Sequence, residues 1–474
     1  MTKTIATSRR PMARAVAMLS ALATIGAQQT AFAAGDPPAA TDLWQSPTLF
    51  GDMGGLRPVL AGRGVSLGVN ETDEVLGNPS GGLRRAAAFD GFTQLGLGVD
   101  TSAFGWPGGV FNVSALQIHG RDLGSEDLDV LELPSSIEAE RATRLWELWF
   151  QQTIGRADVK LGLQSIDQEF LTSQNASVFM NATMGWPVLP SEDLHAGGPA
   201  YPLSSLGIRL RFRPTDTVTV LGGVFDDDPV GGDFANDGQT LGAAQSGTSF
   251  DLGGGALFMA ELQFGVNFAP KASAAPSQQG SPVPSADVAP TDPGSPGTYK
   301  IGGWYDSGAF PDQRLGVGSA QAHRTNLGLY AVADQTVWHR GARTIGVFAR
   351  LMGAPQQDRN LVVFASQGGV TMKAPFAARP NDTVGLGAGI ARLGHQAVLF
   401  QRAEAAAGFD VAVRSAEAML ELTYQAQIAP WWVVQPDLQY LVDPAGSAAL
   451  VGAVAGGRRS GSALVLGLRT SVAF

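Results

Sequence analysis

The closing stretch of the chain, from Gly461 to Phe474, alternates between two kinds of side chain. Every second residue from Leu464 to Phe474 is apolar or β-branched, and the residues on the other face, Arg469 among them, are mostly small or polar. This period-two pattern predicts an extended strand with one apolar face. In a soluble β domain that face would turn inward, whereas in a membrane β-barrel it would turn toward lipid. The strand alone leaves both interpretations open.

Similar segments recur along the chain, and the lengths of their connections favour the second interpretation. The sequence predicts about sixteen such strands, joined alternately by short turns and long loops. Short turns at one end and long loops at the other are typical of an outer-membrane barrel. We therefore predict an all-β fold, a transmembrane antiparallel β-barrel of about sixteen strands with long extracellular loops. A final strand ending at Phe474 would pair with the first to close the sheet, and Phe474 is the expected contact of the barrel-assembly machinery.

The first 33 residues predict a secretory signal peptide. A basic start precedes a short apolar run over residues 15–27, and Ala31-Phe32-Ala33 is a small-x-small cleavage signal. Residues 34–64 predict a tether with one short helical segment near Leu56–Ala61, because the neighbouring glycines prevent a longer helix. The barrel is then expected to occupy residues 65–474 in the outer membrane, surrounded by its lipid.

Composition argues against several other classes of protein. The chain has no cysteine, which excludes disulfides and thiolate metal sites, and its net charge of −10 argues against a nucleic-acid partner. No run of about 18 apolar residues predicts a transmembrane helix. The five histidines show no metal-ligand spacing, so neither a metal nor a cofactor is expected. Two weaker alternatives remain, an exported soluble β adhesin and an outer-membrane hydrolase with a site near Ser191, Asp193 and His195.

Charged residues on the predicted strands indicate which face turns inward. In Ile208–Arg213, three arginines alternate with three apolar residues. Arginine on a lipid-facing surface costs roughly 2–4 kcal/mol at the bilayer midplane, so Arg209 and Arg211 are predicted to point into the lumen. The same alternation turns Trp146 outward. It adds further pore-lining candidates, which are Glu147, Trp149, Lys160, Trp304, Glu421, Asp437 and Arg469.

This set of inward side chains suits a sugar. Guanidinium donors and carboxylate acceptors match vicinal hydroxyls, and tryptophan faces can stack on the C–H face of a pyranose. We expect the cations Lys160, Arg209, Arg211 and Arg469 to oppose the carboxylates across a constriction. The residue chemistry leaves a generic, water-filled pore open as an alternative, either unselective or anion-preferring.

Two long connections depart from the strand pattern. Residues 167–204 mix apolar and amide side chains without strand periodicity, which predicts a third external loop folded into the barrel as a constriction. Residues 270–297 are rich in Pro, Ser, Ala and Gly. That composition predicts a flexible periplasmic linker.

Several stretches, spread over most of the chain, resemble carbohydrate-selective porins of the OprB type. They are LFGDMGGLR at residues 49–57, NATMGWP at 181–187, GTYKIGGWYD at 297–306 and QPDLQY at 435–440. The resemblance implies passive diffusion of glucose-like monosaccharides or oligosaccharides into the periplasm. The sequence leaves both a monomer and a homotrimer open. Met53 stands where that family usually has tryptophan, and the linker is longer than expected. No individual sugar ligand is carried over from the family.

Overall fold

The computed structural model describes residues 42–231, 246–248, 250, 252–267, 295–315, 322–409, 411–445 and 460–474. The predicted signal peptide and the start of the tether lie outside these residues, as does the predicted linker over 270–294. Gly297, predicted as the last linker residue, begins a strand.

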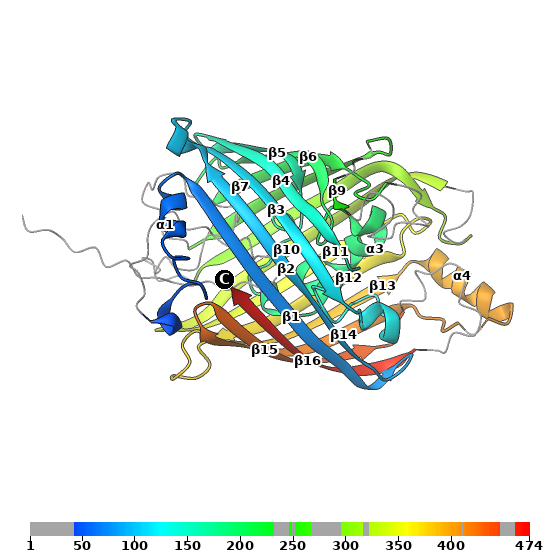
Figure 1. Ribbon diagram of the computed structural model, residues 1–474. Coiled ribbons are helices and arrows are strands. Elements are labelled where there is room, and N and C mark those ends of the chain that lie inside the picture. The colour runs from blue at the N-terminus through cyan, green and yellow to red at the C-terminus, as the bar shows by residue number, and fades with distance from the viewer. Residues whose placement is uncertain are drawn as a thin grey trace, which may run out of the picture.

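Sixteen antiparallel strands form one closed barrel, in which β1 pairs with both β2 and β16 (Figure 1). This confirms the predicted fold class and the predicted number of strands. The strands are β1 (Val65–Gly82), β2 (Ala87–Asp100), β3 (Gly109–Gly120), β4 (Thr143–Ile154), β5 (Ala157–Gln164), β6 (Ser205–Phe212), β7 (Val218–Asp226), β8 (Ala256–Val266), β9 (Gly297–Pro311), β10 (Ala322–Arg340), β11 (Arg343–Gly353), β12 (Val362–Lys373), β13 (Thr383–Leu393), β14 (Ala416–Ala429), β15 (Trp432–Val442) and β16 (Gly461–Ala473).

The helices are short and lie at the ends of the barrel or inside it. In Figure 1, α1 and the end of β16 lie at one end, and α4 projects from the other. None of the helices in the described ranges is long and apolar enough to cross a membrane. The helices are α1 (Leu56–Ala61), α2 (Ala182–Gly185), α3 (Val188–Asp193) and α4 (His395–Ala406), with single turns η1 (Leu43–Gln45), η2 (Thr101–Phe104), η3 (Gly124–Leu128), η4 (Ala176–Val178) and η5 (His195–Gly197).

The two faces of the wall differ as the alternation predicts. On β6, Ile208 is 49% exposed on the outer face, whereas the neighbouring Arg209 is 1% exposed on the inner face. Leu210 and Phe212 continue the exposed apolar face. An apolar outer belt with charged groups inside is the arrangement that a lipid environment requires.

One predicted orientation is wrong. Trp146 of β4 is buried, and its ring contacts that of Tyr201 inside the barrel with centroids 6.2 Å apart. The register between β3 and β4 shifts here, because Ser114 faces Glu147 while Ala115 faces Leu145. This β-bulge places one extra residue, Trp146, in β4 and reverses the alternation on one side of it.

Two connections fold into the barrel, and we call them the first inner segment (residues 121–142) and the second inner segment (residues 165–204). Both carry many buried side chains, charged as well as apolar. The inner face of β13 makes room for them, because three successive inner positions, Gly385, Gly387 and Gly389, are glycines. A Cβ on Gly387 would lie 2.8 Å from the ring of Phe179 and 3.0 Å from the end of Met184. The second inner segment therefore packs directly on the backbone of β13.

Candidate functional site

The arginines predicted to point inward meet on one side of the lumen, in a group that we call the basic cluster. It consists of Lys160, Arg209 and Arg211 with the carboxylates Asp158 and Glu169. Cross-strand pairing of β5 with β6 sets Lys160 opposite Arg209 and Asp158 opposite Arg211, so four of the five charges form two neighbouring pairs on the wall. The fifth, Glu169, comes from the second inner segment.

All three cations of the basic cluster contact Glu169. Arg209 Nε lies 2.7 Å from one carboxylate oxygen, and Lys160 and Arg211 each form an ion pair with the group. Burial alone would raise the pKa of Glu169, but the charges of Arg209, Lys160 and Arg211 outweigh burial and hold that pKa well below its ordinary value. Glu169 is therefore ionised at any physiological pH, and it fastens the second inner segment to β5 and β6.

The basic cluster also includes an aromatic face. Lys160 Nζ lies 5.0 Å from the centroid of the Trp149 ring, within cation–π range. Trp149 and Lys160 reach this position from adjacent strands, β4 and β5. Glu147, also on β4, accepts a hydrogen bond of 3.3 Å from the backbone N–H of Ser165, at the start of the second inner segment. These predicted residues thus lie together.

Another group, which we call the acid wall, lies on β14 and β15 and consists of the predicted Glu421 and Asp437 together with Glu417. The carboxylate of Glu421 accepts hydrogen bonds from the backbone N–H groups of Met180 and Asn181 in the second inner segment. Glu417 does the same for residues 131 and 132 of the first inner segment, at 3.0 and 2.8 Å. Asp437 accepts a hydrogen bond of 2.9 Å from the side-chain amide of Gln439, whose oxygen accepts one from Asn181. Glu417 and Glu421 therefore hold loop backbone, whereas Asp437 bonds a neighbouring residue of its own strand.

The remaining two predicted residues lie apart from both groups. Arg469 of β16 forms an ion pair of 2.7 Å with Glu74 of β1 and donates to Ser136 of the first inner segment. Trp304 of β9 stacks on Tyr330 with ring centroids 6.4 Å apart, in an apolar cluster. The predicted pairing of Arg469 with a carboxylate across the lumen is thus replaced by pairing with its neighbouring strand.

Sequence reasoning missed the partners that come from the inner segments. Glu169 carries no strand pattern, and only the path of the chain brings it to Arg209. The alternation also predicts that Arg350 and Lys300 point inward, and both are buried. The partners that were missed are backbone carbonyls of the second inner segment, including that of Gly185, 3.0 Å from Arg350, and that of Thr172, 2.7 Å from Lys300. One available signal was the row of glycines at alternate positions of β13, which leaves an inner face that another segment must cover.

A closed barrel with an apolar outer wall, a charged interior and segments folded inside defines a porin, a channel that crosses a membrane with strands. Residues 84–474 match the carbohydrate-selective porins of the OprB family, so the chain belongs to that family. It is a carbohydrate-selective porin, and the resemblance drawn from the sequence is confirmed.

Individual relatives support the same assignment. Porin B of Pseudomonas aeruginosa is 26% identical over 475 aligned positions, which cover 92% of this chain and 94% of the relative. The putative porin QuiX of Acinetobacter baylyi is 22% identical and covers 86% of this chain and 91% of its own. The high-pH structure of Pseudomonas putida OprB has a TM-score of 0.71 at 23% identity, over 91% of this chain and 99% of that one. The structural likeness shows a shared fold.

Proposed function

We propose that the basic cluster and Trp149 are the selective part of this porin, and that sugars diffuse passively past the constriction made by the two inner segments. The observation that carries the proposal is the convergence of three cations on one loop carboxylate beside an aromatic ring. Guanidinium groups suit hydroxyl oxygens, and the ring suits a pyranose face. The substrate is a monosaccharide or a short oligosaccharide.

The charge balance of the basic cluster supports a preference for electron-rich solutes. Three cations stand against two carboxylates, Asp158 and Glu169, so the cluster keeps an excess positive charge. Positive potential inside a low-dielectric wall raises the local concentration of anions and orients hydroxyl lone pairs. An anion-preferring porin is the second candidate function, and the same excess charge is the observation that favours it.

The experiment is ion current through the purified, reconstituted chain while glucose is titrated. For the wild type we expect a saturable loss of current, as a sugar occupying the lumen excludes ions. Arg211→Ala should shift the reversal potential toward cations and weaken the glucose effect several-fold. Arg213→Ala is the matched control, because Arg213 is exposed, two residues further along the chain, just beyond β6. Current that glucose leaves unchanged would reduce the chain to a general or anion-preferring pore.

The proposal also covers how the chain reaches the membrane and in what form it works there. The chain is exported by its signal peptide, inserted into the outer membrane through recognition of its closing strand, and works as a monomer or homotrimer without a cofactor. We propose a channel rather than a hydrolase. Ser191 donates to the carbonyl of Pro187 at 3.0 Å, and Asp193 accepts from the N–H of Val362 at 3.1 Å, so both groups have structural contacts.

A further inference from the structure

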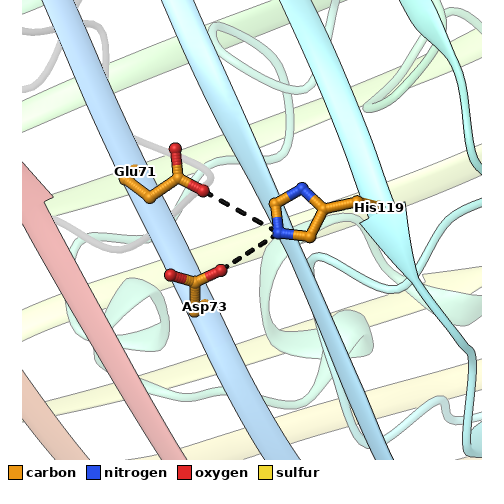
Figure 2. Close-up of side chains that lie close together, drawn as sticks. All are labelled: Glu71, Asp73 and His119. Atoms are coloured by element: carbon orange, nitrogen blue, oxygen red, sulfur yellow. Dashed lines mark hydrogen bonds and ion pairs between the residues drawn. The ribbon is translucent and has the colours of Figure 1, made fainter.

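A polar group lies on the outer wall, where apolar side chains are expected. Glu71 and Asp73 of β1 and His119 of β3 point toward one another across β2 (Figure 2). Their position is set by alternation: Thr72 between the carboxylates is 0% exposed on the inner face, and Val75 on the carboxylates' face is 52% exposed. Carboxylates on a lipid-facing surface are costly unless something neutralises them.

The spacing of the three groups fits a metal ion. Nε2 of His119 lies 3.1 Å from Oδ1 of Asp73 and 3.8 Å from Oε1 of Glu71, and all three atoms lie within 4.8 Å of one another. Ligands held about 2.0–2.2 Å from a tetrahedral zinc ion are about 3.4 Å apart. The three side chains therefore need only sub-ångström adjustments to bind one ion.

The strand between β1 and β3 has a glycine at the point where the three side chains approach one another. Gly91 of β2 is the cross-strand neighbour of both Asp73 and His119. A Cβ at this position would lie 2.4 Å from Oδ1 of Asp73 and 2.8 Å from Nε2 of His119. Any side chain other than hydrogen would therefore occupy the space where the three groups converge.

Hydrogen bonds outside the group point the ligand atoms inward. Oε1 of Gln117 lies 3.1 Å from Nδ1 of His119, so Nδ1 carries the proton and Nε2 faces the carboxylates. The hydroxyl of Thr93 donates to the other oxygen of Glu71. A neutral Nε2 and two carboxylate oxygens all carry lone pairs. A divalent metal ion placed between the three groups would accept all of these lone pairs.

We propose that Glu71, Asp73 and His119 form a divalent transition-metal site on the outer wall, of the zinc class. A proton on Nε2 bonds one carboxylate, and Glu71 at 3.8 Å is too distant to share it. A metal ion binds both carboxylates together with the imidazole, a mixed oxygen and nitrogen set that suits zinc better than magnesium or calcium. Such an ion would tie β1 to β3 across β2, beside the β1–β16 pair that closes the barrel.

The test is zinc binding by the full chain, purified in detergent without a histidine tag. After equilibrium dialysis against zinc, the metal content of the wild type should approach one ion per chain, and the ion should raise the thermal unfolding midpoint. His119→Ala and Asp73→Asn should each weaken binding at least tenfold. Heat-modifiable migration on a gel checks that each variant is a folded barrel.

The control is His323→Ala. His323 also contacts two carboxylates, but through opposite ring nitrogens, Nε2 to Asp312 at 2.9 Å and Nδ1 to Asp358 at 3.5 Å, so the three groups do not converge on one point. This variant should bind zinc like the wild type. Wild-type binding no greater than that of His119→Ala would overturn the proposal, and so would equal affinity for calcium. The first result would leave the three side chains as a hydrogen-bonded group without a metal, and the second would mean a cation site that is not of the zinc class.

Discussion

The second inner segment is fastened to opposite parts of the barrel by two different kinds of contact. At the basic cluster, its carboxylate Glu169 meets three cations of the wall. At the acid wall, the barrel carboxylate Glu421 instead accepts hydrogen bonds from the backbone N–H groups of Met180 and Asn181. The first contact depends on side-chain charge, and the second only on the path of the loop backbone.

This difference separates the parts of the lumen that can set selectivity from those that set shape. Under the proposed function, the surplus positive charge of the basic cluster acts on a permeating solute. Carboxylates bonded to backbone amides position the loop, whatever side chains it carries. We therefore expect substitutions at the basic cluster to change selectivity and loop position, and those at the acid wall to change loop position alone.

The largest effect is expected from Glu169→Gln, which removes the charge shared by the three cations. Removing one partner of a fully buried ion pair costs about 3 kcal/mol or more. The second inner segment should detach from β5 and β6, and the uncompensated cations should shift the reversal potential strongly toward anions. Planar-bilayer recordings measure the shift. Glu126→Gln, which alters an exposed carboxylate paired with Arg121, is the control. If Glu169→Gln kept the reversal potential of the wild type, the basic cluster would not set ion selectivity, and it would not differ from the acid wall in this respect.

A smaller effect is expected from Glu421→Ala. It leaves the buried N–H groups of Met180 and Asn181 without their acceptors, at a cost of about 1–3 kcal/mol. Hydrogen exchange of residues near 180 should accelerate while ion selectivity stays the same. Glu421→Gln retains one acceptor oxygen and should show an intermediate exchange rate. A selectivity change as large as that of Glu169→Gln would show that the acid wall also lines the path of the solute.

The wall could be predicted from the sequence because a strand's alternation is a local property. The three arginines of Ile208–Arg213 identify the inner face without any knowledge of neighbouring strands, and all nine predicted site residues are buried. The outward orientation predicted for Trp146 is wrong, and the reason is not local. Its orientation depends on a bulge opposite Ser114 and Ala115, and a bulge is a property of two paired strands.

The site itself was harder to predict, because many partners of the wall residues come from segments without periodicity. Glu169 and Arg209 are 40 residues apart, and nothing local to either residue specifies their contact. Glu71, Asp73 and His119 were missed for a related reason, since their meeting requires the registers of β1, β2 and β3 together. Sequence alone thus predicts which face a residue occupies, whereas the partner it finds there depends on register and loop path.

The smallest effect is expected from pH and concerns the first inner segment. Burial and the neighbouring Asp122 raise the pKa of Glu138 to about 8, although the N–H groups of Ser125 and Gly124 oppose the shift. The folded state therefore holds a proton that the unfolded state releases near its ordinary pKa. This stabilisation is complete below the ordinary pKa and is lost as the pH rises toward 8. Proteolysis of residues 121–142 should be slower at pH 5.5 than at pH 9.

Glu138→Gln sharpens this prediction because the amide cannot ionise but keeps an oxygen that accepts from Gly124 or Ser125. Its cleavage rate should change much less with pH than that of the wild type, after correction for the protease's own pH profile on an unstructured peptide. Equal pH slopes in the variant and the wild type would assign the effect to another group. A carboxyl that holds its loop best when protonated would add a third kind of fastening, distinct from the ionised Glu169 of the basic cluster.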